Sequence, residues 1–236
     1  MELFRRMAEI LVVDDERIVR DGLKARLQGE GFAVRTARDG ADALAKIAER
    51  RPDLVLLDVM MPRMNGFRVC EEVRRADAAL PIVFLTASAS DGDQVRAIGL
   101  GGDDYVSKSS PDAILLARIG RAIERVSAMA AGAGSQRRGS VVRLGKVSVD
   151  MRTLSVSEGG RETARLTKTE ADILSLLDAA DGRPLSIDAI ISKLRGDGFS
   201  CEDAMVYVHV GNLRRKLGPA ASMVVNHRSE GYVLVR

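Results

Sequence analysis

The chain has 236 residues, of which 46% are hydrophobic and 29% are charged, and its formal net charge is +3. This composition is ordinary for a folded protein and excludes a disordered or collagen-like chain. The length suggests one large or two small domains. No run approaches the roughly 18 apolar residues of a membrane span, so we expect no membrane partner. The two cysteines, Cys70 and Cys201, argue against a disulfide framework, and we therefore expect a cytoplasmic protein in a reducing environment.

The first half alternates short apolar runs with segments whose apolar residues follow a helical period. Such alternation predicts parallel strands joined by helices that cover both faces of one sheet. The expected strands are 9–13, 32–36, 53–57, 82–85 and 104–106. The expected helices are 17–28, 41–48, 67–75, 93–100 and 112–126. The sequence therefore predicts a doubly wound α/β domain of (βα)5 type over residues 1–126.

Residues 127–140 break this pattern because they are small and polar and lack periodicity. We interpret them as a linker. The alternative is the frayed end of the preceding helix, since the alanine-containing segment 128–131 favours helix.

Residues 141–236 follow a different pattern. Three short alternating runs predict a small antiparallel sheet, at 141–144, 146–149 and 153–156. Three helical patterns follow, at 168–180, 187–194 and 201–217. Two apolar runs, 222–225 and 232–235, then predict a β-hairpin. Three helices followed by a hairpin describe an α+β winged helix-turn-helix domain.

Polar side chains stand at the carboxyl ends of the predicted parallel strands. Ligands bind beyond those ends in an open parallel sheet, so we expect one site from Asp14, Asp15, Asp58, Thr86 and Lys108. Neighbouring carboxylates repel one another unless a hard cation such as Mg²⁺ lies between them. A lysine and a hydroxyl beside them would bind phosphoryl oxygens, with Asp58 as the nucleophile. Singly, an aspartate after a strand is more often a turn or cap residue; coincidence at four strand ends favours the site.

The stretches that carry these residues resemble a known family. ILVVDDE (10–16), LVLLDVMMPRMNG (54–66), PIVFLTA (81–87) and GGDDYVSK (101–108) are similar to the receiver domain of bacterial two-component response regulators. LTKTEADILSLL (166–177), VYVHVGNLRRKL (206–217) and SEGYVLV (229–235) resemble the DNA-binding domain of the OmpR/PhoB subfamily. The resemblance covers nearly the whole chain, and Met7 is an alternative start to Met1.

The resemblance implies a transcription factor controlled by phosphorylation. Asp58 matches the phosphoacceptor, and Asp14 and Asp15 match the Mg²⁺ ligands, with the backbone carbonyl of Met60 as a third protein ligand. Lys108 matches the lysine that contacts the phosphoryl group. Beyond self-phosphotransfer and autodephosphorylation at Asp58, no enzymatic activity is implied.

Thr86 and Tyr105 match the switch pair of the family, in which the hydroxyl moves toward the phosphate and the aromatic ring turns inward. A dianion at the phosphoacceptor offers new charge-assisted hydrogen bonds, which agrees with this role. The implied partners are a sensor histidine kinase, promoter repeats in double-stranded DNA and RNA polymerase, with a homodimer forming on activation.

The chain departs from the family after Lys108, where Ser109 replaces the usual proline of a cis peptide. A cis bond before a residue other than proline costs about 2.5–4 kcal/mol. We therefore expect a trans bond, or a strained cis one, and a changed presentation of Lys108.

In the subfamily, the face made by the fourth helix, fifth strand and fifth helix forms a symmetric dimer through salt bridges. Asp104 and Arg118 match one such pair, for which two solvated charges are the alternative. Gln94 and Ile114 occupy the positions of another pair. The set of salt bridges across the interface is therefore incomplete, and Ile114 is expected to pack in an apolar patch of the interface.

The candidate recognition helix is 201–217, which such folds place in the major groove. With its apolar residues turned inward, we expect five residues on or near its outer side: His209, Asn212, Arg214, Arg215 and Lys216. These residue types can contact phosphates and bases; a solvated helix end is the alternative for the basic run. Arg228, in the hairpin, is expected to enter the minor groove.

Basic residues often occupy the subfamily positions that match Ala204, Gly211 and Asn212 here. Fewer cationic contacts predict weaker binding per monomer with a shallower salt dependence. The net charge of +3 divides into −1 over residues 1–126, +2 over 127–140 and +2 over 141–236, which is compatible with an acidic metal site and a modestly cationic DNA-binding domain.

Two other classes compete with this interpretation. An aspartyl-phosphate phosphatase of the haloacid-dehalogenase type needs a second acid two residues after the nucleophile, and that position is Met60. An atypical regulator would bind DNA constitutively and independently of phosphorylation, and Ser109 is its support.

Overall fold

The structure is a computed structural model that describes residues 8–86, 99–131, 141–195, 203–227 and 230–236. The side chains of residues 124–131, 195 and 203–205 are outside this description. The chain divides into two compact units, Met1–Ala133 and Gly134–Arg236.

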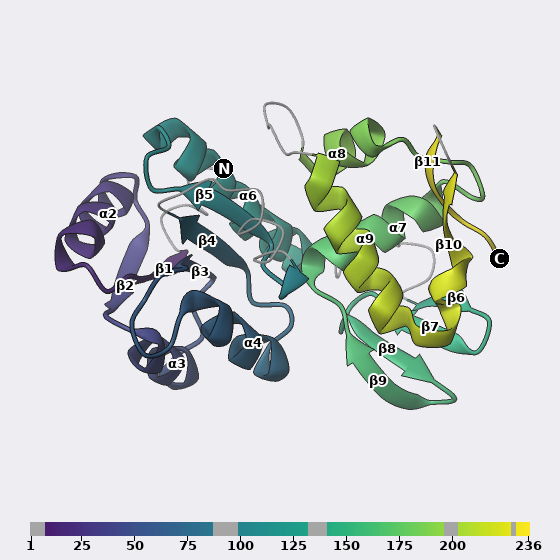
Figure 1. Cartoon of the computed structure of the whole chain (residues 1–236), viewed down its shortest axis with the longest axis horizontal. Helices are drawn as coiled ribbons and strands as arrows, with labels where there is room; N and C mark the ends of the chain where they lie inside the picture. Colours follow the sequence, from purple (N-terminus) through teal and green to yellow (C-terminus); the bar gives the residue numbers. More distant parts are fainter. Residues whose placement is uncertain (1–7, 87–98, 132–140, 196–202, 228–229) are drawn as a thin grey trace. The chain divides into compact units, whose positions relative to one another are not determined.

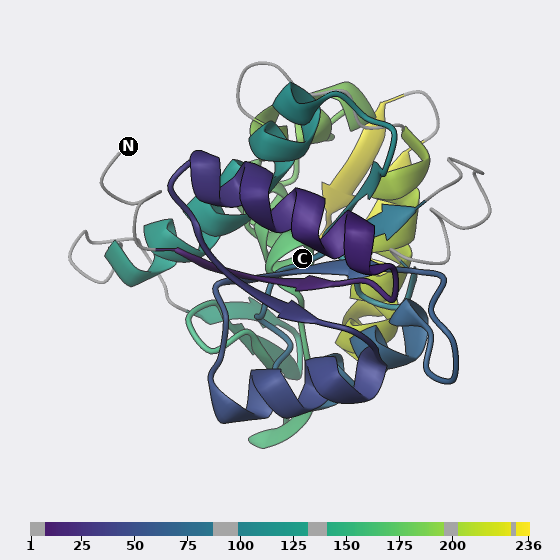
Figure 2. The same cartoon turned by 90° about the vertical axis from the view of Figure 1, so that its left-hand side faces the viewer.

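The first unit contains one parallel sheet of five strands in the order β2-β1-β3-β4-β5. Its strands are β1 (Glu9–Val13), β2 (Ala33–Ala37), β3 (Leu54–Asp58), β4 (Ile82–Thr86) and β5 (Asp104–Ser107). Its described helices are α2 (Arg17–Gly29), α3 (Gly40–Glu49), α4 (Gly66–Ala76) and α6 (Asp112–Ala131). Helices α2 and α6 cover one face of the sheet, and α3 and α4 cover the other (Figures 1 and 2).

Two layers of apolar side chains, one on each face of the sheet, pack between the sheet and its helices. Alternate residues of β1 and β3 point to opposite faces, so that Leu11 packs in the layer with α3 and α4 while Ile10 packs in the layer with α2 and α6. Every residue of β3 and β4 is buried. A strand covered on both faces needs a continuous apolar run, and LVLL before Asp58 provides one.

Apart from the end of α6, the described elements of the first unit begin and end within one residue of the predicted ones. Strands β2 and β3 begin one residue later than predicted. Helix α6 continues to Ala131, so the helical alternative for 128–131 describes the structure. The predicted helix at 93–100 lies almost entirely outside the described residues.

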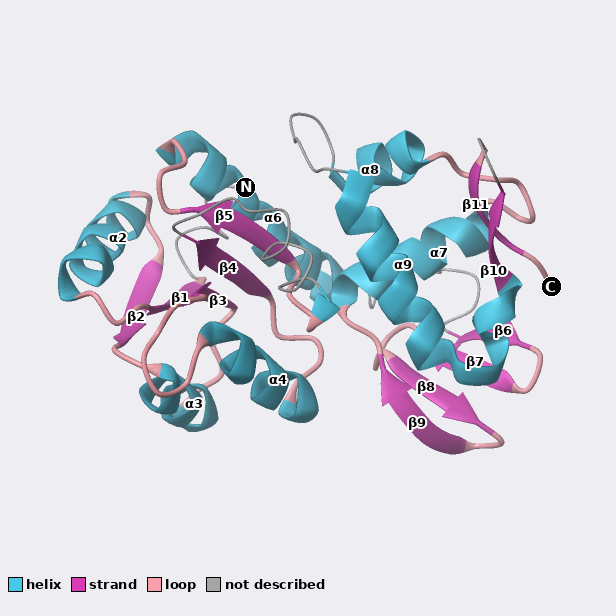
Figure 3. Ribbon diagram, in the orientation of Figure 1, coloured by secondary structure: helices cyan, strands magenta, loops and turns pink. Residues whose placement is uncertain are grey.

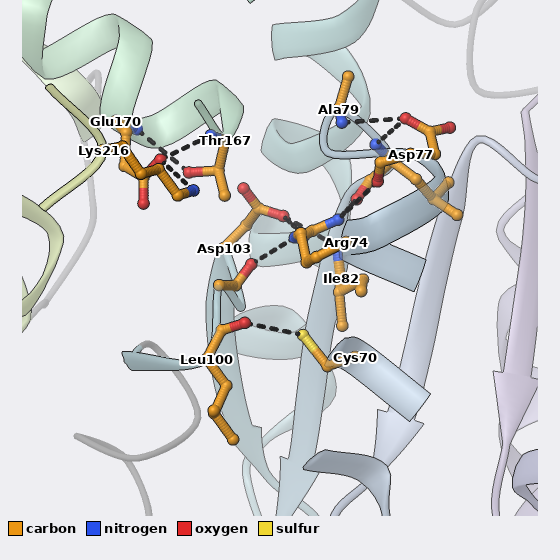
Figure 4. A network of polar contacts seen from close by, with 12 residues as sticks. Cys70, Arg74, Asp77, Ala79, Ile82, Leu100, Asp103, Thr167, Glu170 and Lys216 are labelled. Atoms are coloured by element: carbon orange, nitrogen blue, oxygen red, sulfur yellow. Dashed lines mark hydrogen bonds and ion pairs between the residues drawn. The ribbon is translucent and has the colours of Figure 1, made fainter. Parts of the chain in front are cut away.

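At the amino end of the sheet, the Arg74 side chain joins three segments (Figure 4). Its guanidinium donates to the carbonyls of Leu80 and Gly101 at 2.6 and 2.7 Å, and it forms an ion pair with Asp103 at 2.8 Å. The Asp103 carboxylate in turn accepts from the Ile82 N–H at 3.0 Å. This network fixes the starts of β4 and β5. It therefore also helps to fix the direction of both strands and the position of their carboxyl ends.

The second unit begins with an antiparallel sheet and continues with helices (Figure 3). The sheet contains β6 (Val141–Leu144), β7 (Val147–Asp150), β8 (Ser155–Glu158) and β9 (Arg161–Arg165). The helices are α7 (Lys168–Ala179), α8 (Ile187–Arg195), α9 (Asp203–Leu217) and a 3₁₀ turn, η2 (Gly218–Met223). The hairpin contains β10 (Val224–His227) and β11 (Gly231–Leu234).

This unit has the predicted winged helix-turn-helix architecture, and sequence reasoning missed only β9 and η2. Strand β9, RETAR, lacks an apolar face because four of its five residues are exposed, so it carries no alternating signal. Helix α7 packs on α8 and α9.

The hairpin is fixed to the helices through a short bridge. Leu185, just before α8, exchanges two backbone hydrogen bonds of 2.8 Å with Tyr232 of β11. The backbones approach so closely that a Cβ at Gly231 would lie 2.0 Å from the Leu185 carbonyl oxygen. Gly231 also has a φ of 106°, a region that favours glycine. The hairpin position therefore depends on this glycine.

Among the described helices, none combines the length and apolarity needed to cross a bilayer.

Candidate functional site

The sheet of the first unit brings the predicted polar side chains together at its carboxyl edge. Asp14 directly follows β1, Asp58 ends β3 and Thr86 ends β4, and all three are buried. Lys108 directly follows β5, and its backbone N–H donates to the Thr86 carbonyl at 2.8 Å. The parallel register of these four neighbouring strands therefore produces the site.

The Lys108 ammonium lies between two buried carboxylates. Its Nζ is 2.7 Å from Oδ2 of Asp14 and 3.1 Å from Oδ2 of Asp58. The side chains of Asp14 and Asp58 are 0% and 3% exposed. Buried charges persist when an opposite charge compensates them, and Lys108 provides this compensation.

Burial raises the pKa of Asp58 above its ordinary value, although Lys108 acts in the opposite direction. The neighbouring Asp14 carboxylate adds to the increase. Burial alone would lower the pKa of Lys108, but its contacts with Asp14 and Asp58 outweigh that effect and raise the pKa. The lysine is therefore charged at neutral pH, and Asp58 ionises against the cost of desolvation.

Three carboxylates of this edge form a group that fits a divalent cation. Asp14, Asp15 and Asp58 each offer an oxygen, and these oxygens lie within 4.8 Å of one another. We call these three residues the carboxylate cluster. Asp15 is exposed while the other two are buried, so the cluster is open to solvent on one side. An all-oxygen donor set that leaves room for water suits Mg²⁺.

The loop after Asp58 is held close to the strand it leaves. A Cβ at Gly66 would lie 2.2 Å from the backbone carbonyl oxygen of Asp58. The Gly66 N–H donates to the Val59 carbonyl at 3.0 Å, and the Asn65 side chain caps α4. Met60 lies in this loop, its backbone N–H donates to the Asp58 carboxylate, and its side chain is exposed.

The Lys108–Ser109 peptide is trans, because no described residue takes part in a cis bond. This agrees with the first of the two expectations for Ser109. The Ser109 hydroxyl is 2.8 Å from that of Ser107, and the Ser110 N–H donates to the Ser107 carbonyl at 2.9 Å. Hydrogen bonds between serines thus shape the turn that presents Lys108.

The residues predicted as a switch pair lie on neighbouring strands. Thr86 is buried at the end of β4, and Tyr105 of β5 is half-buried against the layer that contains α4. The guanidinium of Arg118 lies 5.4 Å from the centre of the Tyr105 ring and donates to the Tyr105 carbonyl at 2.7 Å. Movement of this ring would therefore change the contacts of Arg118.

The residues predicted at a dimer interface lie on β5 and α6. Arg118 forms an ion pair with Asp104 of the same chain, and both side chains are mostly buried. Ile114 is 44% exposed at the start of α6.

In the second unit, the three basic residues at the end of α9 differ in their contacts. Nε of Arg214 donates to the Val224 carbonyl at 2.8 Å, and Nζ of Lys216 lies 2.7 Å from Oε2 of Glu170. Arg215 is exposed, with a hydrogen bond to Asn212 at 2.9 Å. Of the three, Arg215 is the most available to an external anion. Arg228 lies outside the described residues.

Two residues expected on the outer side of α9 are buried in the structure. His209 is 4% exposed and Asn212 is 6% exposed. On a helix, His209 lies beside Val206 and Leu213 of the apolar stripe, and Asn212 lies beside His209 and Lys216. The buried stripe is therefore wider than the apolar residues indicate, and the outward positions predicted for these two residues are wrong.

Sequence reasoning missed the role of Glu170. This residue is 0% exposed, its Oε2 accepts from the Thr167 N–H at 2.7 Å, and the same oxygen meets Lys216 (Figure 4). The pattern Thr-x-x-Glu at 167–170 is a capping box, so the sequence did contain a signal for it. The ion pair ties the end of α9 to the start of α7.

Comparison with known proteins agrees with these observations. Residues 10–120 match the family model described as "Response regulator receiver domain", and residues 160–234 match "Transcriptional regulatory protein, C terminal". The chain is 39% identical over 227 residues to "Response regulator MprA" of Mycolicibacterium vanbaalenii, covering 95% of this chain and 96% of the relative. It is 38% identical to the protein of the same name from Mycobacterium tuberculosis, over the same shares.

Solved structures support the fold. A RitR mutant is similar with a TM-score of 0.78 at 22% identity, over 96% of this chain and 98% of that one. DrrB of Thermotoga maritima, described as an OmpR/PhoB homologue, is similar with a TM-score of 0.50 at 24% identity, over 98% and 100% of the two chains. With the two family models and the full-length relatives, the chain belongs to the two-component response regulators of the OmpR/PhoB type, with a receiver domain and a winged-helix DNA-binding domain.

Proposed function

We propose that this regulator is switched by phosphorylation of Asp58 in a Mg²⁺-dependent reaction with a partner histidine kinase. The observation that carries the proposal is the position of Asp58, which is buried at the edge of the sheet, 3.1 Å from Nζ of Lys108 and in one carboxylate cluster with Asp14 and Asp15. An oxygen of Asp58 would attack phosphorus as the bond from phosphorus to the histidine nitrogen breaks. Asp14, Asp15, Asp58 and the Met60 carbonyl would hold Mg²⁺, which neutralises phosphoryl charge.

Lys108 supports this reaction by its two present contacts. It pairs with Asp14 and Asp58 across 2.7 and 3.1 Å, and it would exchange the second contact for a phosphoryl oxygen. A charge-assisted hydrogen bond to a dianion is stronger than one to a monoanion. Thr86, at the end of the adjacent strand, would offer its hydroxyl to the same group, and the ring of Tyr105 would follow inward.

The output of the switch would be dimerisation and promoter binding. Ile114 supplies exposed apolar surface on α6, and the nearby Asp104–Arg118 pair could exchange partners with a second copy. A dimer on repeated half-sites would place two α9 helices in successive major grooves, where promoter-bound protein can act on RNA polymerase. Arg215 is the cation of α9 that we assign to a DNA phosphate.

The test is labelling from a small phosphodonor in the presence of Mg²⁺. Wild type should gain one phosphoryl group per chain by intact mass, and Asp58→Asn should gain none. Asp21→Asn is the matched control, because it changes an exposed aspartate of α2. Affinity for DNA selected from a random pool should then rise on phosphorylation. Equal affinity with and without label would instead favour the phosphorylation-independent regulator.

A further inference from the structure

Four residues of α9 share one face of the helix. Tyr207, Gly211, Arg214 and Arg215 are spaced i, i+4, i+7 and i+8, which places them on the same side. The buried residues Val206, Val210, Leu213 and Leu217 lie on the side that packs into the unit. We call Tyr207, Gly211, Arg214 and Arg215 the reading face.

Gly211 is the member of this face whose presence the fold does not require. It is the ninth of the fifteen residues of α9, it is exposed, and a Cβ built on it would meet nothing within 4 Å. Its backbone is not in the positive-φ region. A glycine in the middle of a helix weakens the helix relative to alanine. Glycine at such a position is explained when a ligand approaches the backbone closely.

Tyr207, one helical turn before Gly211, presents a restrained apolar surface. It is 48% exposed, and its ring contacts that of Tyr232 edge-on, with centroids 6.2 Å apart. Tyr232 is itself held by its two backbone bonds to Leu185 and by the guanidinium of Arg214, 5.6 Å from its ring centre. Because its neighbour is fixed, little side-chain entropy is lost when Tyr207 meets a partner.

We propose that Gly211 lets α9 approach the floor of the DNA major groove and that Tyr207 reads thymine there through its 5-methyl group. This inference rests on the proposed function of DNA binding. The thymine methyl is the apolar group that base pairs present in the major groove, and apolar side chains contact it. The exposed guanidinium of Arg215, on the same face, would take a backbone phosphate and set the distance of approach.

The first experiment uses Gly211→Ala in the full chain. Alanine should raise the thermal midpoint of the second unit by about 4 °C, since it favours helix and meets open space. The same substitution should weaken binding to DNA selected with wild type by about tenfold. The control is Gly22→Ala, an exposed glycine inside α2 whose added Cβ also meets nothing within 4 Å. It should stabilise its own unit and leave DNA affinity unchanged.

The second experiment replaces single thymines of the selected DNA by uracil, which removes only the methyl group. At one position, binding by wild type should fall about fourfold, the equivalent of one buried methyl group. Tyr207→Ala should bind both DNAs equally, and Tyr207→Phe should keep the preference for thymine. Val141→Ala, which shortens an exposed apolar side chain of β6, is the control and should keep it too.

The outcomes separate this inference from the proposed function. If wild type selects no DNA, DNA recognition itself fails. The role assigned to the reading face is wrong, while DNA binding stands, in either of two cases. In the first, wild type binds but Gly211→Ala binds equally well. In the second, no replacement of thymine by uracil changes the affinity in a way that depends on Tyr207. If Tyr207→Ala loses self-association and keeps its DNA preference, the face contacts a second copy of the chain, which also overturns the inference.

Discussion

The two units use charge in opposite ways. In the first, Lys108 and the carboxylate cluster bring charges of both signs together in one group, in which the buried Asp14 and Asp58 depend on one lysine. In the second, the cations of α9 are divided among separate contacts: Lys216 meets Glu170, Arg214 meets a carbonyl and an aromatic ring, and Arg215 is exposed. In the first unit, one new ligand can therefore affect the whole group of charges. In the second unit, the separate contacts fix the positions of individual side chains on the surface.

The largest expected effect comes from removing Lys108, the cation on which the buried carboxylates of the first unit depend. Lys108→Met should lower the free energy of unfolding by about 3 kcal/mol at pH 7 without Mg²⁺, because two buried carboxylates lose their partner. Excess Mg²⁺ should recover part of this loss by binding the folded state. Denaturant unfolding with and without Mg²⁺ measures both effects.

Arg17→Met is the control for that measurement. Its ion pair with Asp21 is exposed, with side chains 85% and 64% accessible, so its loss should change stability by less than about 0.5 kcal/mol. Equal losses for the two variants would show that Lys108 is no more important to the fold than a surface charge.

The second prediction applies the same test to the second unit. Lys216→Met should cost about 2 kcal/mol, because Glu170 is completely buried and loses its cation. Adding Glu170→Gln should return part of the loss, since the neutral amide can still accept from Thr167. The double-mutant cycle isolates the pair, and additive losses would mean that the two side chains act independently.

The third prediction concerns pH. Burial raises the pKa of Asp58, so the folded state holds the proton more tightly than the unfolded state does. Stability from this group is therefore present at low pH and falls as pH rises from the ordinary value of 3.8 through the raised pKa. Asp58→Asn should raise the melting temperature at pH 7 by a few degrees, and the gain should shrink as pH falls toward 4.

Mg²⁺ provides the check on that prediction. A cation among the carboxylates removes the cost of ionising Asp58, so saturating Mg²⁺ should reduce the difference between wild type and Asp58→Asn at pH 7. A difference that is independent of both pH and Mg²⁺ would point to packing of the amide as its cause.

The fourth prediction concerns a substitution on α9, for which we expect the smallest effect on stability. Arg215→Met should change the free energy of unfolding by no more than about 0.5 kcal/mol. It should lower the slope of log affinity for DNA against log salt concentration by about 0.9, the value for one phosphate contact. The slope is measured by titration of DNA at several salt concentrations, and an unchanged slope would remove Arg215 from the interface.

The carboxyl edge could be predicted from the sequence because topology decides it. Once residues 9–13 and 53–57 are recognised as parallel strands, the residues that follow them must meet, and Asp14 and Asp58 do. The face of α9 could not be predicted to the same degree. The apolar stripe shows which side is buried, but it does not show that His209 and Asn212 are buried beside it. Nor does it show which cation has an internal partner.

The ties at both ends of the reading face have a consequence for how such regulators diversify. Glu170 holds the end of α9 through Lys216, and Leu185 holds the hairpin through Tyr232. Gly211 and Arg215 take part in neither tie, and Tyr207, which is 48% exposed, meets Tyr232 only through an edge-on ring contact. Substitutions at these three positions can therefore alter the promoters that a duplicated copy recognises while the domain keeps its stability, so that new regulatory circuits arise without a new fold.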